Sequence, residues 1–231
     1  MQGVDDMNKV LIKVIENKKE LILLAICSFI YISIFTILEH VNLGNYIYTE
    51  TILDNYIPFL PIFVIPYILW FAYIVFGFVY FLIYDNEGFY RTTFYIFVGM
   101  YLSLIVYLLF PNAQGLRVDL DMNNIFHRLL SIIYSNDTST NVCPSIHTYN
   151  SIMMHITLIQ NKKFASNKIL NYSSLILIIF ICLSTVFTKQ HAILDVFYAF
   201  PLCIIVYYLE RSISYTKYLD FKFWKKKLLK V

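Results

Sequence analysis

The chain has 231 residues, of which 59% are hydrophobic and only 14% are charged. This composition excludes a soluble domain of the same length, since such domains carry about 25% charged residues. It predicts an integral membrane protein with the bilayer as its surroundings, and we expect no nucleic-acid partner. The twenty Tyr and twenty Phe agree with this, because aromatic rings are favoured at the interfaces of a bilayer.

A helix needs roughly 17–25 apolar residues to cross the hydrocarbon layer. The sequence predicts an all-α membrane protein with six transmembrane helices in a single domain, 1–231. The second stretch is overlong and begins with Pro58, Pro61 and Pro66, so we expect its start to be kinked or interfacial. The fourth is short and polar. The six stretches are about 21–38, 58–84, 92–110, 145–160, 169–187 and 192–210.

Lys and Arg are distributed unevenly between the two sets of loops. With the N-terminus inside, 15 of them fall on the inner side and three on the outer side. Positive residues are retained in the cytoplasm, so both the N-terminal segment (1–20) and the basic tail (211–231) are predicted to be cytoplasmic. The tail either binds anionic lipid head groups or only anchors the topology. We expect the protein in a bacterial plasma membrane.

The three outer cations are Arg117, Arg128 and Lys189, and they lie in two external loops. Arg binds a phosphate with two parallel hydrogen bonds and Lys binds it as a point charge. A phosphate is therefore the natural partner for cations retained here. The alternative is ordinary pairing with a nearby carboxylate, for which the candidates are Asp119, Asp121 and Asp137.

The first candidate motif is Asn141-Val142-Cys143-Pro144-Ser145-Ile146-His147. Pro144 and Ser145 directly precede an apolar run, which is typical of a helix start with free backbone N–H groups. His147 then falls in the first turn, and Ser151 and His155 follow it at four-residue spacing, with Asn150 beside them. In a membrane this polar face is directed at the bundle interior or a cavity, or Ser151 and His155 bond to neighbouring helices.

The second motif is Lys189-Gln190-His191-Ala192-Ile193-Leu194-Asp195. His191 and Asp195 are four residues apart, so a helix would place them on one face. The carboxylate could then accept a proton from one imidazole nitrogen and leave the other free to attack. Such a His–Asp pair is as often structural as catalytic. The catalytic interpretation is favoured here because the first motif lies at another external helix start.

Together these residues resemble the type 2 phosphatidic acid phosphatase superfamily. Cys143-Pro144-Ser145-Ile146-His147 is similar to its Pro-Ser-x-His motif, and the segment 184–195 is similar to its Ser-Arg-x5-His-x3-Asp motif. The resemblance covers roughly 92–210, the expected catalytic core. Thr185 stands where the family has arginine. Of the family's first motif, Lys-x6-Arg-Pro, only the arginine has a counterpart here, Arg117. The segment around Arg117 is closer to a branch of the superfamily that includes inositol phosphorylceramide synthases.

The resemblance implies an active site at the extracytoplasmic interface. His191 would be the nucleophile that forms a phosphohistidine, Asp195 would orient it, and His147 would be the general acid and base. Arg117, Lys189 and Ser145 would hold the phosphoryl oxygens, with Arg128 and Asn150 as further candidates. No metal and no cofactor is required. The external loop of about 111–144 is long enough to form a structured cover over the site.

The expected activity is hydrolysis of a lipid phosphate or diphosphate at the outer leaflet, such as phosphatidic acid, phosphatidylglycerophosphate or an isoprenyl diphosphate. A transferase of the inositol phosphorylceramide synthase type differs only in its acceptor. Two other classes stay open: a metal-dependent hydrolase that uses His147, His191 and Asp195 as ligands, and a transporter or lipid-binding protein. Cys143 is the one cysteine expected outside the spans, so no external disulfide is predicted, and we expect packing rather than chemistry from its thiol.

Overall fold

The computed structural model describes residues 16–41 and 44–213, and most of that chain is helical. Five helices are long and apolar enough to cross a membrane: α2 (Lys18–His40), α3 (Val64–Tyr84), α4 (Asn86–Leu109), α8 (Lys168–Phe187) and α9 (Ile193–Ser212). The prediction of an all-α membrane protein agrees with these five candidate spans. The basic tail after residue 213 and the first 15 residues, including most of the predicted N-terminal segment, lie outside the described residues.

The proline-rich start of the second predicted span is confirmed as irregular. Pro61 opens the short 3-10 helix η2 (Pro61–Phe63), and the regular helix α3 begins only at Val64. The fixed φ angle and missing N–H of proline suit a first helical turn, where no intrahelical donor is needed.

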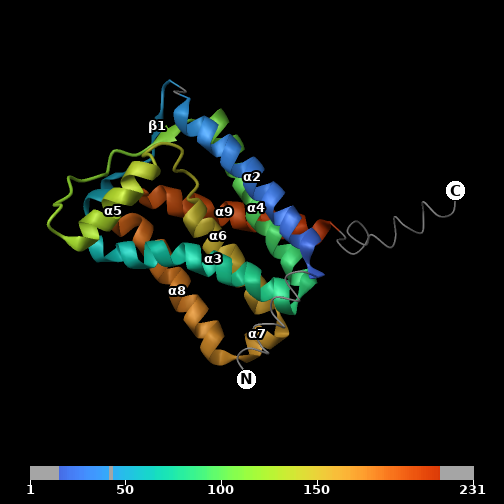
Figure 1. The fold of residues 1–231 in the computed structure, drawn as a ribbon. Coiled ribbons are helices and arrows are strands. Elements are labelled where there is room, and N and C mark those ends of the chain that lie inside the picture. The colour runs from blue at the N-terminus through green and yellow to red at the C-terminus, as the bar shows by residue number, and fades with distance from the viewer. Residues whose placement is uncertain (1–15, 42–43, 214–231) are drawn as a thin grey trace, which may run out of the picture.

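The short polar helix α6 (Ile146–Gln160) is the centre of the bundle, as Figure 1 shows. It packs against α3, α4, α8 and α9, and ten of its fifteen residues are buried. Because protein surrounds it, its polar groups meet other helices instead of lipid. α6 is too short to count among the five candidate spans, so the six-span layout stays a prediction.

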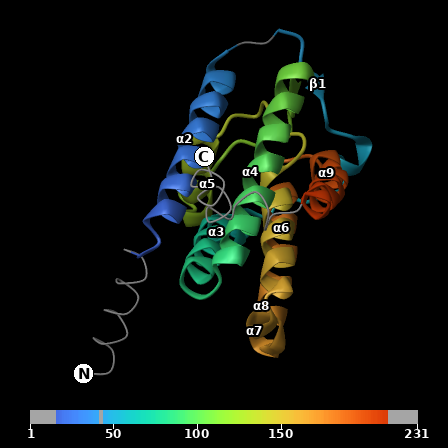
Figure 2. The same ribbon diagram turned by 90° about the vertical axis from the view of Figure 1, so that its right-hand side faces the viewer.

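Helix α2 lies on the outside of this group and packs mainly against α4 (Figure 2). Many of its large apolar side chains are exposed, including Phe29, which is 73% exposed. Exposed apolar side chains of this kind are expected where lipid replaces water as the solvent.

Loops predicted to lie on one side of the membrane do lie at one end of the bundle. At the basic end, Asn17 donates to the carbonyl of Leu82, and Asn161 donates to the Asp85 carboxylate. The Nε of Arg91 lies 3.4 Å from a carboxylate oxygen of Glu210. The small helix α7 (Lys162–Ser166) follows Asn161 directly. The orientation of the two ends relative to the cell remains a prediction.

The opposite end carries the short irregular elements. The strands β1 (Ile47–Tyr48) and β2 (Asn112–Ala113) pair in parallel, and Ala113 also bridges Thr140. The 3-10 helix η1 (Ile52–Asn55) and the helix α5 (Ile125–Asn136) complete this layer. The predicted loop of about 111–144 is therefore structured, since it contains β2 and α5.

Glycines allow α3 and α4 to approach α6 closely. A Cβ at Gly99 would lie 1.9 Å from the Tyr149 ring, and one at Gly77 would lie 2.0 Å from the Met154 sulfur. Tyr149 is held in place, because its buried hydroxyl donates to the carbonyl of Tyr95 at 2.6 Å. Small residues at such crossings are typical of membrane helix packing.

We expect Gly99→Ala to destabilise the protein by about 1–3 kcal/mol, because the added methyl group overpacks the α4–α6 contact. Thermal unfolding of the purified protein in detergent measures this. Leu109→Ala, at a 64% exposed position of the same helix, serves as the control and should leave the midpoint nearly unchanged. An equal midpoint for the two variants would contradict the close packing.

Candidate functional site

The two predicted motifs meet where helices α6 and α9 begin. The backbone N–H of Ser145 donates to the carbonyl of Asp195 at 2.9 Å, so the two helix N-termini are joined directly. Ser145 is also the N-cap of α6 and is fully buried, with its Oγ 3.4 Å from the N–H of Thr148. This capping role is typical of serine, and it places the Ser145 hydroxyl inside the helix start.

Asn112 in β2 fixes the segment that leads into α6. Its Oδ1 accepts from the N–H groups of Val142 and Cys143 at 2.9 and 2.8 Å. Its Nδ2 donates to the carbonyls of Phe110 and Cys143. One buried side chain thus satisfies four backbone groups, as a strand would. The segment ends in the cis peptide bond between Cys143 and Pro144.

The turn between α8 and α9 presents His191. Lys189 adopts a positive φ of 56°, and the N–H groups of Gln190 and His191 both donate to the carbonyl of Thr185 at 3.0 Å. A residue in this left-handed region reverses the chain sharply. Thr185, which replaces the family's arginine, therefore acts here through its backbone, and its buried hydroxyl donates to the carbonyl of Cys182.

His147, His191 and Asp195 form one continuous hydrogen-bonded relay. The Nδ1 of His191 lies 3.3 Å from Oδ2 of Asp195, and its Nε2 lies 3.3 Å from Nδ1 of His147. The same Asp195 oxygen accepts from the N–H of Ala192 at 2.8 Å. The two histidines are 6% and 5% exposed and the aspartate is fully buried, so the relay is almost closed from solvent.

The relay constrains where the imidazole protons lie. A carboxylate only accepts hydrogen bonds, so the Nδ1 of His191 carries the proton directed at Asp195. In the neutral ring the Nε2 of His191 is then an unprotonated acceptor, and the proton shared with His147 belongs to Nδ1 of His147. His191 thus offers a lone pair and His147 offers a proton, which is the division of work between nucleophile and general acid.

Aromatic rings from α3 hold the His147 imidazole. The ring centroids of Tyr67 and Trp70 lie 4.6 and 4.5 Å from that of His147. Tyr67 is 1% exposed and its hydroxyl bonds to Asp137 at the end of α5. α3 therefore forms one wall of the site, and it sets the plane of the imidazole that donates the proton.

Arg117 lies beside the site through Gln190. Its guanidinium donates to the side-chain oxygen of Gln190 at 2.8 Å and to the carbonyls of Tyr134, Asp137 and Thr138. Burial lowers the pKa of Arg117, and the carboxylate of Asp137 opposes this shift. The charge therefore lies beside Gln190, the neighbour of His191. Nη1 and Nη2 of Arg117 already have acceptors, whereas its buried Nε has none.

Lys189 is directed away from the relay. Its Nζ donates to the carbonyls of Asp54 and Ile57 at 2.9 and 2.7 Å, which ties the α8–α9 turn to η1 and to the segment that follows η1. Burial lowers the pKa of Lys189, and Asp54 opposes the shift. The lysine thus stabilises the turn that carries His191, and its ammonium does not point into the relay.

The remaining predicted residues occupy different positions. Arg128 is exposed on α5, and Asn150 is 1% exposed on α6 with its Oδ1 lacking a hydrogen-bond partner. Ser151 donates to the carbonyl of His147. His155 bonds to Ser174 of α8 at 2.8 Å, which confirms the interpretation of His155 as a contact between helices.

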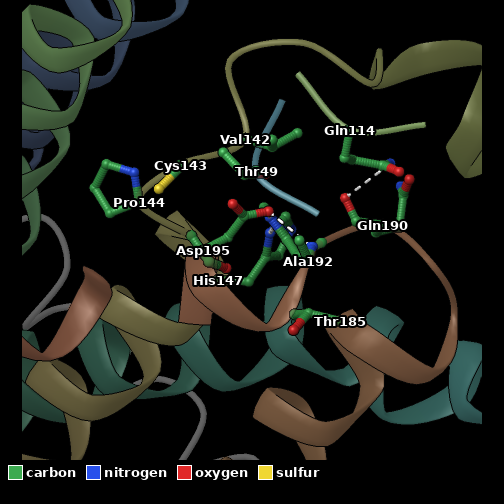
Figure 3. A network of polar contacts seen from close by, with 12 residues as sticks. Thr49, Gln114, Val142, Cys143, Pro144, His147, Thr185, Gln190, Ala192 and Asp195 are labelled. Carbon is green, nitrogen blue, oxygen red and sulfur yellow. Dashed lines mark hydrogen bonds and ion pairs between the residues drawn. The ribbon is translucent and has the colours of Figure 1, made fainter. Parts of the chain in front are cut away.

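Sequence reasoning missed several residues of the site. Gln190, Tyr67 and Asp137 were not assigned to it, although Gln190 adjoins His191 in the chain. Gln114 donates to the carbonyls of Lys189 and Gln190 and so connects β2 to the same turn (Figure 3). The three-residue spacing of Tyr67 and Trp70 could have indicated Tyr67, since it places both aromatic rings on one face of α3. Nothing local in the sequence marks Asp137.

Cys143 packs against the relay without the properties of a reactive thiol. Burial, and then the neighbouring Asp195 carboxylate, raise the pKa of Cys143 far above that of an ordinary thiol. A nucleophilic cysteine needs the opposite shift. All four cysteines are free.

The described part of the chain contains no group of three or more His, Cys, Asp and Glu side chains arranged to hold a metal ion. Comparisons with family models, with curated proteins and with solved structures give no match.

We expect Asn112→Ala to destabilise the protein by about 2–4 kcal/mol, because it leaves buried backbone groups of the 142–143 segment without partners. Limited proteolysis should then cut this segment faster than in the wild type. Asn123→Ala, in the exposed loop before α5, removes a comparable amide and should have little effect on either stability or cleavage. Wild-type protection in Asn112→Ala would contradict the role assigned to this side chain.

Proposed function

We propose that this protein is a membrane enzyme that removes a phosphate group from a lipid phosphate or diphosphate through a phosphohistidine on His191. The observation that carries the proposal is the relay of Asp195, His191 and His147, in which both hydrogen bonds measure 3.3 Å. The two histidines are 44 positions apart in the chain, and few structural needs require them to meet in the protein interior.

In the first step the Nε2 of His191 attacks phosphorus. The N–P bond forms while the bond from phosphorus to the lipid oxygen breaks. The leaving alkoxide takes a proton from His147, which enters this step protonated on both nitrogens and leaves it as the neutral ring. Asp195 stabilises the positive charge that develops on the His191 ring. Since His147 now contacts Nε2 directly, the His147 ring has to move aside to admit the phosphoryl group.

In the second step His147 acts as the base. It removes a proton from water, the water oxygen bonds to phosphorus, and the N–P bond breaks to return neutral His191 and inorganic phosphate. Proton transfer of this kind contributes typically 10²–10⁴-fold to a rate. The N-terminus of α6 and the nearby charge of Arg117 stabilise the negative charge on the phosphoryl oxygens.

The surrounding helices support a lipid as the substrate. The site lies at one end of a bundle with five apolar helices long enough to span a bilayer. We propose that this end lies at the level of the lipid head groups. Phosphatidic acid, phosphatidylglycerophosphate and an isoprenyl diphosphate all present a phosphoryl group at that level. We propose that this end faces the outside of a bacterial plasma membrane, in accordance with the distribution of Lys and Arg.

The burial of the relay favours a second candidate function, transfer of the phosphoryl group to a lipid or polyol hydroxyl. His147 and His191 are both less than 7% exposed, so little water reaches them in this conformation. An acceptor alcohol that replaced water in the second step would give a transferase with the same residues. Product analysis in the presence of added alcohols separates the two reactions.

Phosphate release from lipid phosphates in the presence of EDTA tests the proposal. We expect the purified wild type to release phosphate with the chelator present, and His191→Ala to reduce kcat by at least about 10³-fold, because the covalent step is lost. His155→Gln changes a buried histidine of α6 outside the relay and serves as the control.

If the wild type is inactive until metal is returned, a metal-dependent hydrolase replaces the proposal. A rate that survives in His191→Ala would also exclude the phosphohistidine. Acid-labile incorporation of labelled phosphate into the wild type, absent in His191→Ala, would identify the intermediate directly.

Asp195→Asn tests the assignment of the protons. The amide keeps the size of the side chain but can donate to Nδ1 of His191, which would place the ring proton on Nε2 and remove the attacking lone pair. We expect kcat to fall by about 10³–10⁴-fold with a small change in KM, as for other histidines held in the wrong tautomer. Thermal unfolding in detergent controls for the loss of the α9 cap. A wild-type kcat would contradict the assignment.

A further inference from the structure

Asp137 brings a carboxylate close to the histidine pair. Its Oδ2 accepts from the Tyr67 hydroxyl at 3.3 Å, and the Tyr67 ring packs against His147 at 4.6 Å. The same hydroxyl accepts from Nε2 of Gln190 at 3.5 Å, next to His191. The Tyr67 side chain therefore links the Asp137 carboxylate to the His147 ring, against which it packs, and to Gln190, the chain neighbour of His191.

The nearby charges do not favour a strongly negative ligand. Asp54 is 1% exposed and accepts from the N–H of Ile193 at 2.7 Å, so a carboxylate already occupies the start of α9. Arg117 and Lys189 donate to carbonyl groups, as described above. Near the relay, three carboxylates, those of Asp54, Asp137 and Asp195, thus accompany two cations.

We propose that Asp137 selects the charge of the substrate, so that the site takes a phosphoryl group with one negative charge in preference to a doubly charged phosphate monoester. A phosphodiester, or a monoester that retains one proton, meets this condition. The inference rests on the proposed function. It disfavours doubly charged monoesters as substrates and adds phosphodiesters to the substrates considered there. Each additional negative charge in a partly desolvated site meets repulsion that bulk water would screen.

The same chemistry applies to a phosphodiester. His191 Nε2 bonds to phosphorus as one ester P–O bond breaks, and the departing alkoxide takes the His147 proton. The enzyme then holds a phosphomonoester linked to His191. Water releases it as a monoester, or an alcohol takes it to form a new diester, and in either case the proton of the acceptor returns to His147.

The effect of pH follows from the groups around Asp137. They are Tyr67 from α3, Glu39 from α2, Arg117 from the loop after β2 and His191 from the α8–α9 turn. Burial raises the pKa of Asp137, and Glu39 raises it further, while His191 and Arg117 lower it. As the pH falls, Asp137 is neutralised at a higher pH than an ordinary aspartate, and a doubly charged monoester takes up one proton at about pH 6. Both changes favour a monoester at acidic pH.

A pair of chromogenic lipids tests the inference: the phosphate monoester of a nitrophenol that carries a long alkyl chain on its ring, and the methyl diester of the same phosphate. Both release the same coloured phenol, and they differ by one charge. At pH 8 we expect Asp137→Asn to raise kcat/KM for the monoester roughly tenfold relative to the diester. Between pH 8 and pH 5, the monoester-to-diester ratio should rise more steeply in the wild type than in Asp137→Asn.

Two further variants control the comparison. Asp119→Asn removes an exposed carboxylate from the same loop and should leave the ratio unchanged. Asp137→Glu keeps the charge and should keep the wild-type ratio, which separates charge from folding if Asp137→Asn loses stability. An unchanged ratio in Asp137→Asn, or a ratio altered equally in Asp137→Glu, would overturn the role of Asp137.

Failure of the proposed function looks different in the same assay. Neither substrate would then be cleaved by the wild type, or cleavage would survive in His191→Ala. Active wild type and inactive His191→Ala, with no change of ratio in Asp137→Asn, would leave the phosphohistidine proposal intact and remove the charge selection alone.

Discussion

The burial of one short polar helix among five apolar ones is the constraint on which the structure depends. α6 carries His147, Asn150, Ser151 and His155, which lipid would not tolerate at these positions, so α3, α4, α8 and α9 enclose it. Glycines at the α3 and α4 crossings allow this close approach. Because other helices enclose α6, the helix can be shorter than the bilayer is thick and still hold a polar group at its N-terminus.

The proposed chemistry arises from two helix starts held together by backbone contacts. The bond from Ser145 N–H to the Asp195 carbonyl places the first turns of α6 and α9 side by side, and the Thr185 carbonyl shapes the turn that presents His191. These backbone hydrogen bonds set the geometry of the relay. Preorganisation of this kind suits a nucleophile held as His191 is, while the His147 ring still has to move aside for the phosphoryl group.

Arg117 and Lys189 do not act in the structure as their residue types alone suggest. Arg117 and Lys189 were predicted to hold phosphate, and both were placed at the correct end of the bundle. In the structure they donate mainly to backbone carbonyls, so they stabilise the loops that carry the relay. Sequence indicates that a charge is retained at an interface, but only the fold determines which acceptors surround it. The excess of carboxylates beside the relay follows from the same packing.

The sequence by itself determined the helical membrane class, the approximate helix boundaries, the common end for both motifs and the pairing of His191 with Asp195, because hydrophobic length, charge distribution and four-residue spacing are local properties. The tertiary structure decided the contact between His147 and His191 across 44 positions, the aromatic wall of Tyr67 and Trp70, and the approach of Asp137. These contacts join different helices and loops, and their positions depend on how side chains pack between elements, which no local pattern encodes.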